Sequence, residues 1–377
     1  MRNILFLLSL FSPKKGRYWW SVLFWTALVA PAQASLQLRV AIEEGVSQVK
    51  VGSSTIAVVR DYSTGKKLGQ MAAMNAFYAQ PRAGGVSVNQ MQSGAIGIEP
   101  TGNGSVYIGD RWYRGTTLVF PTNKGLTAVN YVDLEQYLYS VLGSEMNGNW
   151  HQEALKAQAV AARTYAIYKR ENEKNGIYDL GDTQASQVYN GIESESHSTH
   201  KAVNATNGQV LIYKNRIILS VFHACSGGHT ENVEDVWSQS LPYLRGVQDF
   251  DQNVRECQWV KTLSGQEISK RISGVGNVVS LSPSFTPYGS IKAIKFVGDR
   301  GTRSLKGEAV RNALGLRSTN FTITEDPSGL RLYGRGWGHG LGMSQWGAYN
   351  LAKQGVNYQQ ILAHYYRGTS LARMQVQ

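Results

Sequence analysis

Short runs of β-branched and aromatic residues, broken by Gly, Asn and Ser at turn spacing, fill the chain from about residue 36 to 132. The segments SQVKVGSSTIAVVRDYSTGKKL and GNGSVYIGDRWYRGTTLVFP show this pattern most clearly. Such runs are typical of short strands joined by tight turns. We therefore expect a strand-rich N-terminal region over residues 35–132.

A helical pattern begins at Asp133, whose side chain is a suitable N-cap, and continues through LEQYLYSVL until Gly143. Glu145 would then lie on a short connection just after this helix. A second helix is predicted from about Asn149 to Arg170, with Asn149 as its N-cap.

The second predicted helix is unusually apolar. Its polar positions fall on one narrow stripe, and Ala, Leu, Val, Ile and Tyr occupy most of the others; the stripe consists of Gln152, Lys156, Arg163 and Arg170. A helix with so little polar surface is expected to be buried, and its alanines allow neighbouring elements to approach closely. The connection that carries Glu145 would thus be held by a core helix.

The remaining pattern mixes both kinds of element. GQVLIYKNRIILSVFHACSGG predicts a hairpin that ends in a glycine-rich corner, and residues 260–325 predict a small α+β insertion with helices near 264–272 and 306–314. The last 45 residues predict a strand, a glycine loop and two helices. We therefore expect an α+β fold, in which the strand-rich N-terminal region packs on a mixed α/β core, residues 133–377, that carries the insertion.

The first 34 residues have the pattern of an export signal. Four basic residues precede and flank the apolar run YWWSVLFWTALVA, and AQA at 32–34 has the small-x-small form of a cleavage site. A run of 13 residues is short for a membrane span, which needs about 20. We expect an exported protein of the periplasm or cell wall, which would be membrane-anchored if the leader is not cleaved.

Charge adds a preference for anionic partners. The formal net charge is +12, and removal of the four leader cations leaves +8, since 12 − 4 = 8. An excess of this size attracts polyanions or serves solubility. No basic run with interleaved aromatic residues and no zinc-finger spacing is present, so we expect no nucleic-acid partner. Wall polymers and lipid headgroups are the anions that an exported protein meets.

Glu145 is the first candidate for chemistry. Most loop glutamates only satisfy nearby donors or cations, but Glu145 lies between Met146 and Trp150 at the end of a predicted buried helix. Apolar surroundings raise the pKa of a carboxyl group, so that it keeps the proton that a general acid must deliver.

The segment FHACSGGHTENVEDVW, residues 222–237, is the second candidate. His223, Cys225 and His229 could contribute to a metal site, although HxCxxxH alone is a weak zinc signal. Cys225 and Cys257 are the two cysteines of the chain. In an oxidising compartment they are expected to form a disulfide.

The third candidate is GRGWGHGLGMSQWGA, with glycines at every second position from 334 to 342. It lacks the Gly-Lys-Ser/Thr of a P-loop and the spacing of a dinucleotide fingerprint. In an extended strand, such glycines leave one face bare for a flat ligand or a second backbone. Trp337 and His339 would then project from the opposite face, where a sugar ring could stack.

Taken together, SVLGSEMNGNWHQEALKAQAVAARTYA, DTQASQVYNG with FHACSGGHTENVEDVW, and GWGHGLGMSQWGAYNLAKQGVNYQQILAHYYRGT closely resemble the SpoIID/LytB family of bacterial cell-wall proteins. The resemblance covers residues 36–370 and implies lytic transglycosylase activity on peptidoglycan, with Glu145 of the SEM element as the catalytic residue. The other residues that it marks are candidates for substrate binding: Gln158, Arg163, Gln187, Tyr189, His223, Ser226, Gly227, Trp337, His339 and Gln345.

The resemblance also implies an alternative function, and this sequence departs from the pattern of some family members at one segment. One relative is described as an amidase enhancer, so a wall-binding protein that stimulates an N-acetylmuramoyl-L-alanine amidase without catalysis remains the alternative function. Some sporulation members bind zinc through His and Cys just before QVY. Here DLGDTQASQVY contains neither residue, and we expect no metal cofactor.

A single carboxylate suits this chemistry. A hydrolytic glycosidase generally uses two carboxyl groups. A lytic transglycosylase can use one twice, because the C6 hydroxyl of MurNAc closes a 1,6-anhydro ring and replaces water as nucleophile. The resemblance also suggests that strands already stripped of stem peptides are the substrate. A bare glycine face would fit such strands, because a stem peptide on each MurNAc would collide with so close a backbone.

Overall fold

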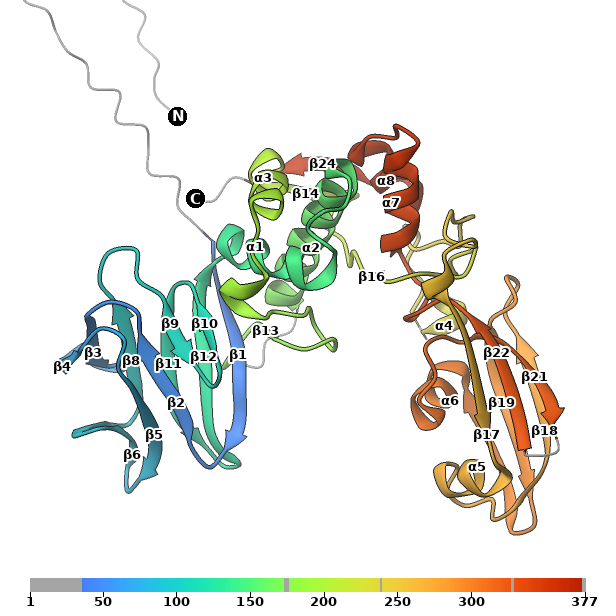
Figure 1. The fold of residues 1–377 in the computed structure, drawn as a ribbon, viewed down its shortest axis with the longest axis horizontal. Helices are drawn as coiled ribbons and strands as arrows, with labels where there is room; N and C mark the ends of the chain where they lie inside the picture. Colours follow the sequence, from blue (N-terminus) through green and yellow to red (C-terminus); the bar gives the residue numbers. More distant parts are fainter. Residues whose placement is uncertain (1–35, 173–175, 238, 327–328, 375–377) are drawn as a thin grey trace, which may run out of the picture. The chain divides into compact units, whose positions relative to one another are not determined.

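The computed structural model describes residues 36–172, 176–237, 239–326 and 329–374. The predicted signal peptide, residues 1–34, lies outside these ranges. The described chain mixes helices and strands in an α+β fold, as the sequence predicts (Figure 1). None of its helices combines the length and apolar character that a membrane crossing requires.

The strand-rich region forms two sheets. The first is seven-stranded, in the order β13-β1-β12-β11-β8-β3-β4. Its strands are β1 (Gln37–Val46), β3 (Ala57–Asp61), β4 (Lys67–Met71), β8 (Ile96–Pro100), β11 (Thr116–Thr122), β12 (Gly125–Asp133) and β13 (Leu180–Gly181). The second is six-stranded, in the order β10-β9-β2-β5-β6-β7. Its strands are β2 (Val49–Ser53), β5 (Ala76–Arg82), β6 (Gly85–Val88), β7 (Met91–Ser93), β9 (Val106–Ile108) and β10 (Arg111–Tyr113).

The two sheets share one hydrophobic core. Alternate side chains of strands in both sheets, such as Val51, Val88, Ile98 and Val119, are fully buried in the same cluster. This alternation of buried and exposed positions is the period that a half-buried strand requires. The same cluster continues into the helices, so the sheets and helices form one packed unit.

The helical part of the core comprises α1 (Leu134–Glu145), α2 (Gln152–Asn172), α3 (His197–Ala205), α4 (Val233–Val236), α7 (Gln345–Lys353) and α8 (Tyr358–Tyr365), with 3-10 helices at Gly191–Ser194 and Arg255–Cys257. Strands β14 (Gln209–Tyr213), β15 (Arg216–Ile217) and β24 (Ser370–Arg373) form a small antiparallel sheet, and β16 (Phe222–His223) pairs in parallel with β23 (Met343–Ser344).

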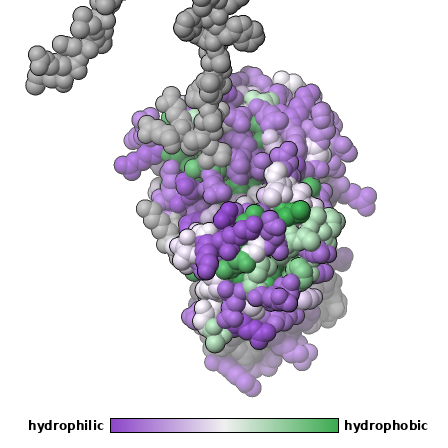
Figure 2. Space-filling view, turned by 90° about the vertical axis from the view of Figure 1, so that its left-hand side faces the viewer, coloured by the Kyte–Doolittle hydropathy of each residue, from purple (hydrophilic) through white to green (hydrophobic). Residues whose placement is uncertain are grey.

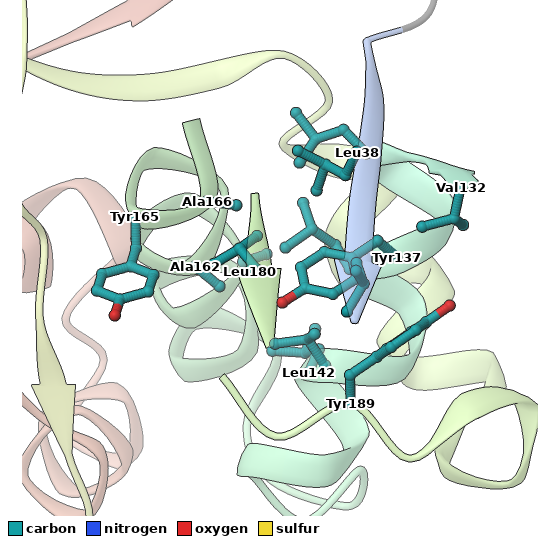
Figure 3. Packing of buried hydrophobic residues seen from close by; sticks show 14 of the residues in the cluster. Leu38, Val132, Tyr137, Leu142, Ala162, Tyr165, Ala166, Leu180 and Tyr189 are labelled. Carbon is teal, nitrogen blue, oxygen red and sulfur yellow. The ribbon is translucent and has the colours of Figure 1, made fainter. Parts of the chain in front are cut away.

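Helix α2 is buried as predicted, because its alanines allow close packing. Figure 3 shows Ala162 and Ala166 on this helix near Leu180, with the rings of Tyr137 and Tyr189 on the far side of the same cluster. The centroids of these two rings are 4.8 Å apart. The first turns of α1 and the segment that precedes α3 are thereby fixed to the same core.

Two predicted helix boundaries are corrected. Helix α1 does not stop at Gly143 but continues to Glu145, and Gly143 is needed because a Cβ there would collide with the carbonyl oxygen of Ser194. Helix α2 begins at Gln152, so Asn149 is not its N-cap. Instead, Nδ1 of His151 accepts a hydrogen bond from the backbone N–H of Glu153 in the first turn. Asp133 caps α1 as predicted.

The insertion has its own hydrophobic cluster. It contains a sheet in the order β17-β22-β21 and a sheet in the order β18-β19-β20, shown in Figure 1 in yellow to red. Its elements are β17 (Gln258–Leu263), α5 (Gly265–Arg271), β18 (Val278–Phe285), β19 (Ile291–Gly298), β20 (Gly301–Lys306), α6 (Gly307–Leu314), β21 (Asn320–Asp326) and β22 (Gly329–Arg335). Both helices fall where the sequence predicts them.

The surface drawn in Figure 2 is mainly hydrophilic, and hydrophobic residues reach it in small groups among hydrophilic ones. Isolated apolar residues on a surface are normal and do not by themselves indicate a partner.

Candidate active site

Glu145 is the last residue of α1, and two segments distant in sequence supply its hydrogen bonds. The backbone N–H of Val188 donates to its Oε1 (3.0 Å), and Nε2 of Gln345 donates to its Oε2 (3.3 Å). The side chain is half-buried. Burial raises the pKa of Glu145 above its usual value, and the two donated bonds lower it to a smaller extent. A carboxyl group held in this way retains its proton more readily than an exposed one.

The short parallel pairing of β16 with β23 brings the second and third sequence motifs together. Phe222 is paired with Met343 and His223 with Ser344, and Cys225 forms an isolated bridge with Trp337. Gln345 follows Ser344 as the first residue of α7. This pairing therefore fixes both the histidine of one motif and the glutamine of the other beside Glu145.

His223 and His339 lie against each other, with ring centroids 5.4 Å apart. Burial lowers the pKa of His223 to about 4 and that of His339 well below its usual value. Both rings are therefore neutral near pH 7. Nδ1 of His223 lies 3.0 Å from the carbonyl oxygen of Leu341, to which it can only donate, so Nε2 of the neutral ring is an acceptor.

The Nε2 atom of His223 is buried and has no hydrogen-bond partner among the described residues. His223 lines the same cleft as Glu145. A neutral acceptor at this place suits a hydroxyl or amide N–H of a ligand. It does not suit a carboxylate, which needs a donor.

The cleft has a volume of about 820 Å³. Four of the predicted site residues line it together with Glu145: His223, Trp337, His339 and Gln345. The ring of Trp337 is 46% exposed, and the guanidinium of Arg317 lies 4.6 Å from its centroid. The cleft therefore combines a half-buried carboxyl group with an exposed aromatic ring.

Sequence reasoning missed a second carboxylate in this cleft. Glu308, the second residue of α6, accepts a bond from Nε1 of Trp237 (3.0 Å) and pairs with Arg311 (3.3 Å). All three residues line the cleft. The sequence offered no signal for this, because the segment GEAVRNAL is an ordinary helix and only the folding of the insertion brings it to the site.

Several predicted substrate-binding residues do not line the cleft. Gln158, Arg163 and Gln187 are fully buried, and Tyr189 is nearly so. Arg163 pairs with Glu135 (2.6 Å), Gln187 accepts from the hydroxyl of Tyr137 (3.1 Å), and Tyr189 donates to Asn130 (2.9 Å). These side chains already have interior partners, apart from Gln158, so their observed role is to hold the helices and sheets behind the site.

Ser226 and Gly227 also lie outside the cleft, in the glycine-rich turn that follows Cys225. The hydroxyl of Ser226 donates to Asp249 (2.6 Å), and the backbone N–H groups of Ser226 and Gly227 donate to Asp251 (2.5 and 3.1 Å). Burial and the neighbouring Asp249 raise the pKa of Asp251 to about 6. The two residues shape the loop behind His223.

The glycine-rich stretch does not form the extended bare face that its spacing predicts. Gly336, Gly338, Gly340 and Gly342 have positive φ angles of 88°, 118°, 77° and 66°, so the chain turns repeatedly. A Cβ at Gly338 would come within 2.6 Å of the Cβ of His223, and one at Gly342 would collide with the carbonyl oxygen of Val221. These two glycines allow close packing against the segment of β16.

Cys225 and Cys257 form the predicted disulfide, with their Cα atoms 6.0 Å apart. The metal reading of His223, Cys225 and His229 is wrong, because Cys225 is bonded to Cys257 and His229 stacks on Tyr288 instead (3.9 Å). Within the described residues, the ligand atoms that converge belong to Cys225, Asp251 and Cys257. A disulfide removes both thiolates of that group.

The fold and site thus define an α+β protein with a half-buried carboxyl group in a cleft assembled from three separate sequence motifs. Residues 122–213 match the SpoIID family, described as stage II sporulation protein. The chain is 32% identical to stage II sporulation protein D of Bacillus subtilis, over 65% of this chain and 76% of that protein. The chain belongs to the SpoIID family.

Two further relatives extend this comparison. An uncharacterized protein of Brachyspira hyodysenteriae is 36% identical over 69% of this chain and 72% of its own length. The protein named amidase enhancer of Bacillus subtilis is 34% identical over 62% of this chain, but the match spans only 40% of that relative.

Proposed function

We propose that this protein is an exported cell-wall enzyme that cleaves the MurNAc–GlcNAc bond of peptidoglycan glycan strands without water and leaves 1,6-anhydroMurNAc ends. The observation that carries the proposal is the state of Glu145. Its carboxyl group opens into the cleft, burial raises its pKa, and Val188 and Gln345 fix both of its oxygens. These are the properties of a general acid that later acts as a base.

In the proposed reaction, protonated Glu145 gives its proton to the oxygen that bridges C1 of MurNAc and the next GlcNAc. The C1–oxygen bond breaks, and the GlcNAc hydroxyl leaves. The Glu145 carboxylate, which Val188 and Gln345 stabilise through their N–H donors, then accepts the proton of the C6 hydroxyl. The C6 oxygen bonds to C1, so the acid is regenerated and no water is consumed.

The surroundings of Glu145 support this role. Trp337 offers an exposed ring for stacking a sugar, and Nε2 of His223 offers a neutral acceptor for a sugar hydroxyl or N-acetyl N–H. Both residues line the cleft. Export is supported by the disulfide, since such bonds persist in oxidising compartments.

The test is the Glu145→Gln variant, which keeps the size of the side chain but carries no proton to donate. Anhydro-muropeptide release from purified glycan, measured by mass spectrometry, should fall by about 10²- to 10⁴-fold. Glu153→Gln is a matched control on α2 that should cut normally. Near wild-type release by Glu145→Gln would refute the proposal.

We further propose that strands stripped of their stem peptides are cut faster than intact peptidoglycan. The bare glycine face that would accept an unbranched strand is absent, because protein packs against Gly338 and Gly342, and the family resemblance alone supports the preference. Parallel digestion of intact and amidase-treated sacculi tests it, and equal rates would contradict it.

Stimulation of an N-acetylmuramoyl-L-alanine amidase is the second candidate function, favoured by the name of the amidase enhancer relative. Peptide release from sacculi by an added amidase would then increase in the presence of the protein. The Glu145→Gln variant would stimulate as well as the wild type, and the protein alone would release no anhydro product.

A further inference from the structure

The β17-β22-β21 sheet of the insertion has one buried and one open face. Trp259, Leu332 and Phe321, one from each strand, are buried in the cluster of the insertion. On the other face, Tyr333 of β22 lies between Val260 and Thr322 in the strand register. Tyr333 is 43% exposed and Val260 is 55% exposed.

The next row of this open face is polar and cationic. Arg335 lies between Gln258 of β17 and Asn320 of β21. The guanidinium of Arg335 has neither an ion pair nor a hydrogen bond in the part of the chain that the structure describes, and the same is true of Arg255, which precedes β17. Both residues are exposed. An arginine without a partner is free to form a bidentate pair with a carboxylate.

A groove of about 790 Å³ covers this part of the sheet. The groove is also lined by Phe285, the last residue of β18, and by Tyr288, which follows that strand; both side chains are exposed, and His229 lines the groove beside them. His229 stacks on Tyr288 with ring centroids 3.9 Å apart, which holds that ring in place. No Asp or Glu is among the residues that line the groove, while Arg255 and Arg335 both line it.

The groove lies next to the cleft that contains Glu145, because residues two positions apart in the chain line the two sites. Arg335 lines the groove, Trp337 lines the cleft, and only Gly336 lies between them in the chain. Gly336 packs against the backbone of Cys225 and Ser226, and its N–H donates to the carbonyl oxygen of Cys257 (2.6 Å). The disulfide and these contacts hold the two sites in a fixed relation at this point.

We propose that the open face of the β17-β22-β21 sheet is a second carbohydrate-binding site, which takes an acidic glycan. Aromatic rings stack on the apolar faces of sugar rings, and free guanidinium groups pair with carboxylates. The ligand that combines both features in the proposed setting is the peptide-stripped glycan strand, whose MurNAc residues carry lactyl carboxylates. This inference rests on the proposed substrate, peptidoglycan glycan, but does not require that the protein cleaves it. The site would bind the part of the strand that extends out of the cleft.

The experiment measures binding of the full chain to fluorescently labelled peptide-stripped glycan strands by anisotropy. Every protein carries Glu145→Gln, so that the probe is not consumed. The double variant Tyr333→Ala/Arg335→Ala should bind at least about tenfold more weakly, since one charge-assisted bond and one stacked ring are lost. The matched control is Tyr78→Ala/Arg82→Ala, a tyrosine and an arginine exposed on β5, and it should bind normally.

Further probes identify the ligand chemistry. Neutral chitin oligosaccharides should bind more weakly than the acidic strand, and Arg335→Ala alone should not affect their affinity. Equal binding by the two double variants would overturn the proposal. Competition by poly(glycerol phosphate), with no competition by unlabelled glycan, would overturn it as well. Thermal unfolding checks that Tyr333→Ala/Arg335→Ala is folded; if it is not, Tyr333→Ser and Arg335→Gln are tested singly.

Failure of the proposed cleavage has a different signature. In a background with Glu145 intact, the double variant should still cut a short glycan that fills only the cleft, but should cut long strands more slowly. If the wild type releases no anhydro product while the groove variants lose binding, the groove stands and the proposed cleavage does not.

Discussion

Nε2 of Gln345 lies 3.3 Å from Oε2 of Glu145, although 200 positions separate the two residues in the chain. The bond lowers the pKa of Glu145, and burial raises it by more. Gln345 therefore contributes, together with burial and the N–H of Val188, to the balance between the protonated and ionised forms of the proposed acid.

Replacement of Gln345 by leucine should move this balance toward the protonated form. Activity that requires protonated Glu145 is present below its pKa and lost as pH rises through it, so the alkaline limb of the kcat/KM profile should shift to higher pH. The rate at the optimum should fall about tenfold, because a bond to the charged form is lost. Gln359→Leu, an exposed position of α8, is the control. An unshifted limb would show that Gln345 only packs beside Glu145.

Glu145 should also destabilise the folded protein at neutral pH. Its pKa is raised in the folded state from the usual 4.5, so the native protein binds this proton more tightly than the unfolded chain. The stability contributed by the protonated form is present below pH 4.5 and lost as pH rises through the folded pKa. Urea unfolding should find Glu145→Gln more stable than the wild type at pH 7 but equal at pH 4. A destabilised variant at pH 7 would contradict this.

Glu308 distinguishes two kinds of glycan cleavage. A hydrolase would need a second carboxylate, and Glu308→Gln would then reduce the rate by about 10²- to 10⁴-fold. In the proposed reaction, Glu308 only orders Trp237 and Arg311 at the edge of the cleft. We therefore expect a loss of less than about tenfold, with 1,6-anhydro ends retained. Reducing MurNAc ends in the wild-type product would indicate hydrolysis instead.

Arg163 should affect stability rather than catalysis. Its side chain is fully buried and pairs with Glu135, so Arg163→Ala should destabilise the protein by about 3–5 kcal/mol, since a charge is left unpaired. The double variant Arg163→Met/Glu135→Leu should recover most of this loss. Urea unfolding measures both. A stable Arg163→Ala variant with a raised KM would restore the substrate-binding role predicted from the sequence.

The disulfide should stabilise the corner that links the cleft to the groove. It closes a separation of 32 residues, which is worth about 3–4 kcal/mol if it acts on the unfolded chain. Thiol titration of the denatured, exported protein should find no reactive thiol. Cys225→Ala/Cys257→Ala should unfold at lower denaturant concentration, and an unchanged midpoint would contradict the expected stabilisation.

The elements whose signals are local could be placed from the amino-acid sequence alone. The cap at Asp133, the alanine-rich α2, the strands before residue 133 and the two helices of the insertion all depend on neighbouring residues or on a short period. The disulfide also followed from the sequence, because the chain has two cysteines. Glu145 could be singled out because its apolar neighbours are adjacent in sequence.

The surroundings of Glu145, in contrast, depend on contacts between segments that are distant in the chain. Gln345 and His223 reach the cleft through the pairing of β16 with β23, and Glu308 reaches it through the folded insertion. Arg163 occupies a polar position of its helix, yet it is buried because Glu135 of α1 neutralises it. The alternating glycines suggested a strand, but contacts with His223 and Val221 impose turns. In each case a partner distant in sequence decides the outcome, and no local pattern contains that partner.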